Sequence, residues 1–192
     1  MANLIRRRVL KAWVASVLLS CVPLNLMAQE KRAAGEKPEM NMEPLISALQ
    51  ATNKPVCMKV ADALSTQNQE GTSYDLHLRS ADLNLEDVTA IVKAIHAIDE
   101  SGNAKLRSLS MSYNGNIGDE GMTILAKYLP RSVQEIGLVR CNIGDKGAQA
   151  LISWMADANA LGMLCVEENA FSSAMKIQIK QEGKGRRMML VV

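Results

Sequence analysis

Two stretches of this 192-residue chain are nearly identical: NIGDEGMTILAKYL at Asn116–Leu129 and NIGDKGAQALISWM at Asn142–Met155. The second begins 26 residues after the first. Recurrence at a period of about 20 to 50 residues indicates a stack of similar structural units, because each unit must bury its apolar face against its neighbours. We therefore expect one repeating scaffold over most of the chain.

A short apolar pattern precedes each of these stretches. Its spacing is LxxLxLxxN, and apolar residues two positions apart face the same side of a β-strand. Equivalent residues lie 27 apart between Leu109 and Ile136 and 28 apart between Ile136 and Leu164, whereas Leu76 lies 33 residues before Leu109. Each copy therefore predicts one short strand of a shared sheet. The copies are Leu106, Leu109, Met111 and Asn114; Val133, Ile136, Leu138 and Cys141; Leu161, Leu164, Val166 and Asn169; and, more loosely, Leu76, Leu78 and Ala81.

A helix is expected after each strand. Asp119 and Asp145 are predicted N-caps, since a carboxylate can accept hydrogen bonds from the free N–H groups of a first helical turn. Asn84 and Asp87, three residues apart, predict the capping side chains of the first copy. Leu125 would cover the same core as the strand residues. The chain is therefore predicted to have an α/β fold with about four strand-helix repeats and a parallel sheet.

The segment LRSLSMSYNGNIGDEGMTILAKYL (Leu106–Leu129) resembles leucine-rich repeats of the ribonuclease-inhibitor-like type, and the resemblance extends over Ser73–Gly183. It implies a short solenoid with strands on a concave face, helices on a convex face and a role in binding other proteins. It also implies a buried ladder of side chains that satisfy the loop backbone. The ladder positions hold Asn114, Cys141 and Asn169, and Ala81 departs from this pattern.

Residues 1–28 are predicted to be a secretory signal peptide. Arg6–Arg8 and Lys11 give a basic start, and the apolar stretch Ala12–Leu19 is shorter than the roughly 20 residues that span a bilayer. The protein is therefore expected to be exported, periplasmic or secreted, with no membrane span after cleavage. An alternative stays open: LLSC ending at Cys21 resembles a bacterial lipobox, which would make the protein a lipoprotein anchored to a membrane through Cys21.

Composition divides the rest of the chain into four segments. Residues 29–45 are charged and contain proline and glycine, which predicts a flexible linker. Residues 46–72 carry apolar residues at helical spacing and predict an N-terminal helical cap. Residues 73–183 hold the repeats, and residues 184–192 are predicted to form a C-terminal cap.

Charge and cysteine content argue against several functional classes. The formal net charge is +2, and residues 1–28 carry four basic residues and no acidic one, so the remainder carries −2. The absence of a dense basic stripe argues against nucleic-acid binding. Cys57, Cys141 and Cys165 lack the spacing of a metal site, and no motif for a phosphate-containing cofactor is present. We therefore expect no metal and no cofactor.

Residues that alternate with the apolar strand positions are predicted to line the concave face and to contact a protein or peptide. These residues are mostly small and of mixed charge, and they lack the clusters of Tyr, Trp and Arg that usually anchor tight interfaces. The alternative function is a structural or inhibitory component of the cell envelope, in which the stack supplies rigidity. The predicted face consists of Asp75, His77 and Arg79; Ser108, Ser110 and Ser112; Glu135, Gly137 and Val139; and Met163, Cys165 and Glu167.

One pair on this face suggests an enzyme. His77 and Cys165 fall in the same column, and a Cys/His pair can generate a nucleophilic thiolate. Three strand steps of about 4.8 Å separate them by about 14 Å, which is beyond hydrogen-bond reach. The sequence therefore predicts a binding protein and not an enzyme.

Overall fold

The computed structural model describes residues 40–66, 72–102 and 104–192. The predicted signal peptide, the alternative anchor residue Cys21 and residues 29–39 of the predicted linker lie outside these ranges. The described elements, in chain order, are α2 (Glu43–Ala51), α3 (Pro55–Thr66), β1 (Ser73–His77), α4 (Leu85–Glu100), β2 (Lys105–Ser110), α5 (Gly118–Tyr128), β3 (Glu135–Gly137), α6 (Asp145–Asp157), β4 (Met163–Cys165), α7 (Ser173–Gly183) and β5 (Met189–Val191).

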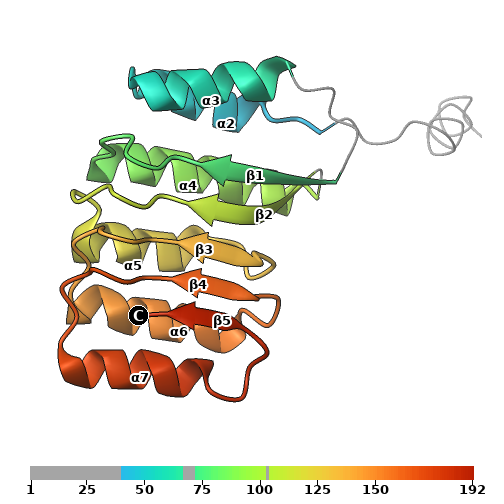
Figure 1. Ribbon diagram of the computed structural model, residues 1–192. Coiled ribbons are helices and arrows are strands. Elements are labelled where there is room, and N and C mark those ends of the chain that lie inside the picture. The colour runs from blue at the N-terminus through green and yellow to red at the C-terminus, as the bar shows by residue number, and fades with distance from the viewer. Residues whose placement is uncertain (1–39, 67–71, 103) are drawn as a thin grey trace, which may run out of the picture. The chain divides into compact units, whose positions relative to one another are not determined.

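The strands of the described residues form one parallel sheet in the order β1-β2-β3-β4-β5. Strands β1 to β4 are each followed by a helix, and these helices lie on one side of the sheet (Figure 1). Parallel neighbours need a crossover of a dozen or more residues, and the helix of each repeat supplies it. The predicted fold, a short α/β solenoid of strand-helix repeats, is confirmed.

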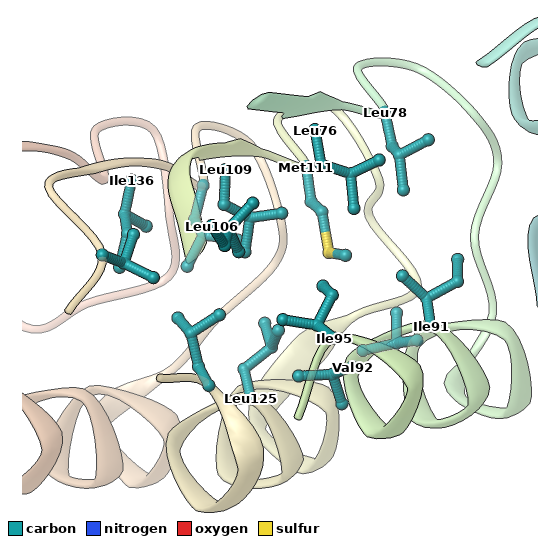
Figure 2. Close-up of a cluster of buried hydrophobic side chains, with 14 of the residues drawn as sticks. Leu76, Leu78, Ile91, Val92, Ile95, Leu106, Leu109, Met111, Leu125 and Ile136 are labelled. Carbon is teal, nitrogen blue, oxygen red and sulfur yellow. The ribbon is translucent and has the colours of Figure 1, made fainter. Parts of the chain in front are cut away.

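The core lies between the sheet and the helices. Leu76, Leu109, Ile136 and Leu164 are direct neighbours across four strands, and none is more than 2% exposed. Figure 2 shows the leucines of β1 and β2 pointing toward apolar side chains of α4 and α5. No unit could bury this row alone, so the stacking of units provides the hydrophobic stabilisation.

Helices α2 and α3 pack at the β1–α4 end of the stack. Leu45, Leu49 and Cys57 are completely buried and belong to the same core as the strands. Helix α2 begins at Glu43, inside the range predicted as linker. Pro44 is compatible with this early start because the N–H that proline lacks would have no helical partner in the first turn.

A charged capping site ties these helices to the first repeat. Asn84 and Asp87 form the predicted capping box, in which each side chain accepts a 2.9 Å hydrogen bond from the backbone N–H of the other residue. The Asp87 Oδ2 atom also lies 3.1 Å from Lys54 Nζ, in the turn between α2 and α3. Because both side chains are largely buried, loss of either partner would leave the other charge buried and unpaired.

Asp119 and Asp145 were predicted to cap their own helices, and this prediction is wrong: each contacts the next repeat instead. Helix α5 already begins at Gly118, so Asp119 lies inside the first turn and its side chain reaches the next repeat. Asp119 Oδ1 accepts hydrogen bonds from Gly144 N at 2.7 Å and Gly147 N at 2.8 Å, at the start of α6. Asp145 Oδ1 in turn accepts from Ser172 N, immediately before α7, at 2.8 Å. Each aspartate therefore contacts the start of the following repeat's helix, and α7 itself is capped by the Ser172 hydroxyl.

The glycines of the second copy leave room for this contact. A Cβ atom added to Gly147 would lie 2.7 Å from Asp119 Oδ1 and 3.0 Å from Asp119 Cα, and one added to Gly144 would lie 3.2 Å from Asp119 Oδ2. This contact gives a physical reason for the aspartate of IGDEG and the two glycines of IGDKG. Asp119 of the first copy accepts hydrogen bonds from the N–H groups of Gly144 and Gly147 in the second.

Strand β5 extends the sheet at its last described edge. It pairs with β4 through Met163 with Met189 and Cys165 with Val191. Its central residue, Leu190, packs against the core, so its two neighbours point to the opposite face. Residues 184–192, predicted as a C-terminal cap, therefore contain an edge strand.

Candidate functional site

The strand face is defined here as the side of the sheet opposite α4 to α7. The strand register places the predicted face residues in two rows that cross the sheet. These rows are Asp75, Ser108, Glu135 and Met163, continued by Met189, and His77, Ser110, Gly137 and Cys165, continued by Val191. A third row, just beyond the strand ends, holds Arg79, Ser112, Val139 and Glu167.

Some predicted face residues have little exposed surface. Ser108, Ser112 and Val139 are only 6%, 2% and 9% exposed. The Ser112 hydroxyl accepts a 3.2 Å hydrogen bond from Val139 N, so it serves the backbone of the next repeat. These three side chains can contribute little to a contact with another molecule. Alternation along a strand gives the direction of a side chain but not the cover that its neighbours provide.

A charged group occupies the β1 side of the strand face. The register between β1 and β2 shifts at Tyr74 and Asp75, and Arg107 has no direct partner in the pairing. Its guanidinium forms ion pairs with Asp75 and with Glu135, the latter at 3.3 Å from Nη1 to Oε1. Arg107 was not predicted as a face residue, because the spacing of the apolar residues does not reveal the shift in strand register beside it.

A second group lies along the ends of the strands, and we call it the rim cluster: Arg79, Tyr113, Arg140 and Glu168. The guanidinium carbon of Arg79 lies 3.9 Å from the centre of the Tyr113 ring, and that of Arg140 lies 5.7 Å from it. Arg140 Nε also pairs with the Glu168 carboxylate. Of these four residues, the predicted face included only Arg79.

The backbone of the rim cluster explains why it was missed. Tyr113, Arg140 and Glu168 each lie two residues after the last apolar strand residue, and their φ angles are 64°, 53° and 58°. Ser80 occupies the same position in the first repeat, with φ 54°. Left-handed backbone is uncommon for residues other than glycine, and it turns the side chain away from the direction that strand alternation predicts. The signal available in the sequence was that these residues occupy the same position in successive repeats.

The predicted ladder residues lie behind the strand ends and hold neighbouring units together. Asn114 is 1% exposed; its Oδ1 accepts from Leu83 N at 3.0 Å and its Nδ2 donates to Leu78 O at 2.9 Å. The thiol of Cys141 donates to a backbone carbonyl of the preceding unit at 3.3 Å. Asn169 Oδ1 accepts from Cys141 N at 3.0 Å. These contacts satisfy buried backbone groups, so the role of the three side chains is structural.

An apolar group occupies the other end of the strand face, and we call it the apolar end: Met163, Cys165, Met189 and Val191. The register makes Met163 a direct neighbour of Met189, and Cys165 a direct neighbour of Val191. Met189 is 59% exposed and Val191 39% exposed. Methionine is flexible and polarisable, which suits an adaptable contact surface. The strand face therefore changes from charged at β1 to apolar at β5.

The chemistry of individual groups gives little support for catalysis. His77 Nε2 lies 3.5 Å from Ser108 Oγ, but within the described ranges no carboxylate hydrogen-bonds to the imidazole and Ser108 is buried. Burial raises the pKa of the Cys141 thiol to about 11. Burial and, secondly, the charge of Glu167 raise the pKa of Cys165. A raised pKa reduces the thiolate fraction and so the nucleophilicity at neutral pH.

Two further features of the described residues bear on function. They contain no group of His, Cys, Asp and Glu side chains arranged to hold a metal ion. None of the helices in these ranges combines the length and the apolar composition needed to cross a bilayer. The strand face is therefore the candidate functional surface of the described residues.

Comparison with known proteins supports the repeat assignment. A sequence model described as leucine-rich repeat matches residues 102–126 and 130–151, which span β2 to α6. No curated protein gives a significant match to the chain. The matched residues contain both NIGD segments and the Asp119 contact between them. The matches and the strand-helix stack built around them support a leucine-rich repeat protein.

Proposed function

We propose that this is an exported protein-interaction module that binds another protein through its strand face. Leucine-rich repeats are typically binding scaffolds without enzymatic activity, and this supports the general class. The proposed export rests on the basic and apolar segments within residues 1–28. The ribonuclease-inhibitor-like subtype, which rests on the residues of the repeat, belongs to the same proposal.

The observation that carries the proposal is the rim cluster beside the exposed rows of the strand face. Tyrosine and arginine dominate the energetics of many protein interfaces because they combine a large apolar area with hydrogen-bond donors. The Tyr113 ring lies close to two guanidinium groups, one from each neighbouring repeat. These side chains contribute nothing to the hydrophobic core, since none of them belongs to it. Their placement is best explained by contact with another molecule.

Affinity capture with strand-face variants tests the proposal. Ser110→Trp places a large side chain in the middle of the strand face, and Gln149→Glu changes an exposed position on α6, on the helix side. Both variants should melt close to the wild-type temperature. The full chain and Gln149→Glu should capture the same proteins from the envelope fraction or medium of the producing cells, and Ser110→Trp should lose them. Undiminished capture by a folded Ser110→Trp variant would refute binding through this face.

Cell fractionation tests the proposed localisation. Recovery of the mature chain in the periplasm or medium supports cleavage near Ala28. Membrane recovery that is lost with globomycin, an inhibitor of lipoprotein signal peptidase, would instead support anchoring through Cys21. A Cys21→Ala variant provides the matched control, because it removes the lipidation site and leaves the rest of the predicted signal unchanged.

A further inference from the structure

We infer that the strand face takes an extended segment of a partner protein, with a carboxylate at Arg79 and a bulky apolar side chain about five residues away at the apolar end. This inference rests on the proposed function and adds the chemistry of the partner. The segment would run across the strands, from the rim cluster toward Met163 and Met189. Three observations carry the inference: an uncompensated charge, an exposed apolar surface and the distance between them.

The charge belongs to Arg79. Arg107 is balanced by two carboxylates and Arg140 by Glu168, whereas Arg79 forms no ion pair with any of the described residues. Its guanidinium stacks on the Tyr113 ring, which holds the group in place and leaves N–H donors at its edge. A planar, preordered guanidinium favours a carboxylate, because it can donate two parallel hydrogen bonds to the two oxygens.

The apolar surface lies at the opposite end of the strand face. Met189 and Val191 are among the few large hydrophobic side chains that the described residues expose, and they flank Met163 and Cys165. Such a surface favours an aliphatic or aromatic side chain of a partner. Between the two ends, Ser110 and Gly137 have small side chains or none. A backbone segment can therefore approach the sheet closely there.

The distance between the two ends sets the spacing of the partner residues. From β2, which leads to Tyr113, to the middle of β4 and β5 is about 12 Å across the sheet. Arg79 also lies three residues, about 10 Å, further along the strand direction than the centre of the apolar end, so the direct separation is about 16 Å. An extended chain covers about 3.3 Å per residue, and about five residues span this distance. The acidic and apolar residues should therefore stand about five positions apart.

Selection from a library of random twelve-residue peptides displayed on phage tests the inference with the immobilised full chain. The enriched peptides should carry Asp or Glu about five positions from Leu, Ile, Met or Phe. When the Arg79→Glu variant is the immobilised target, the enriched peptides should carry Lys or Arg in place of the acidic residue and keep the apolar one. When the Met189→Lys variant is the target, they should keep the acidic residue and lose the apolar one. Lys127→Glu, an exposed change on α5, should return the wild-type peptides.

The outcomes separate this inference from the proposed function. Binding of a selected peptide should weaken at least tenfold for Arg79→Glu and for Ser110→Trp, and remain unchanged for Lys127→Glu. Peptides that require an unobstructed Ser110 but show no acidic preference would overturn the inference and leave strand-face binding intact. Peptides indifferent to Ser110→Trp would refute both. A selection that enriches no peptide would also overturn the inference, since it states that a short segment suffices.

Discussion

The contact between Asp119 and α6 predicts that one carboxylate stabilises two repeats. Replacing Asp119 with alanine leaves Gly144 N and Gly147 N without their acceptor and removes a negative charge from the N-terminus of α6. A hydrogen bond to a charged group contributes about 1.5–3 kcal/mol net, and loss of an N-cap costs about 0.5–2 kcal/mol. These values describe overlapping parts of one contact, and water can reach the half-buried site. We therefore expect Asp119→Ala to lower the free energy of unfolding by about 2–3 kcal/mol.

This loss should be visible in thermal unfolding. For a domain of this size, 1 kcal/mol shifts the melting temperature by about 2–4 °C, so Asp119→Ala should melt about 5–10 °C lower, as followed by circular dichroism. Asp119→Asn keeps an acceptor oxygen and should lose about half as much. Glu120→Ala changes the exposed neighbouring residue and should shift stability by at most about 0.5 kcal/mol. The reasoning is refuted if the Asp119→Ala and Glu120→Ala variants have the same melting temperature.

Three further predictions concern charge, thiol reactivity and register. Because the backbone N–H of Ser172 lowers the pKa of Asp145, the contact stabilises the fold above the ordinary carboxyl pKa and is lost as pH falls through the lowered value; the difference in melting temperature between wild type and Asp145→Asn should therefore shrink from about pH 6 to pH 2. In native protein at pH 8, a thiol reagent should modify the partly exposed Cys165 and spare the buried Cys141 until unfolding. Leu138→Asp, at a position 1% exposed, should abolish cooperative melting, and a wild-type melting curve would contradict the register.

The parts of the fold that were predictable are those that repeat with the period of the backbone. The row Leu76, Leu109, Ile136 and Leu164 was visible because apolar residues two apart must share a face, and the same spacing recurred along the chain. The capping box of Asn84 and Asp87 was visible because its two partners lie three residues apart. Local spacing encodes both features.

The partner of Asp119 was not predictable from local spacing. An aspartate near a helix start has two sets of N–H groups within reach, its own helix and the next one in the stack. Helix α5 begins one residue before Asp119, and this small difference sends the carboxylate to Gly144 and Gly147. A shift of one residue in a helix start leaves no mark in the spacing of apolar residues. The sequence could therefore indicate a cap but not which helix it serves.

The sequence predicted which residues lie on the strand face, but not which of them are buried or form ion pairs. Alternation placed residues such as Asp75, Ser110 and Cys165 on the strand face, where the register puts them. It could not show that Ser112 would be covered or that Arg107 would reach two carboxylates across an irregular pairing. Those properties depend on contacts between repeats 27 or more residues apart, which no single copy contains.

The rim cluster separates the demands of folding from those of binding. A residue other than glycine in left-handed backbone costs about 1 kcal/mol or more, and Tyr113, Arg140 and Glu168 all adopt it at the same position of successive repeats. Glycine there would relieve this strain, and these side chains do not belong to the hydrophobic core. Burial in the core therefore gives no reason for a phenol, a guanidinium and a carboxylate at these places. The same turn geometry displays each side chain beside its neighbour from the adjacent repeat, where they contact one another and where the proposed partner would meet them.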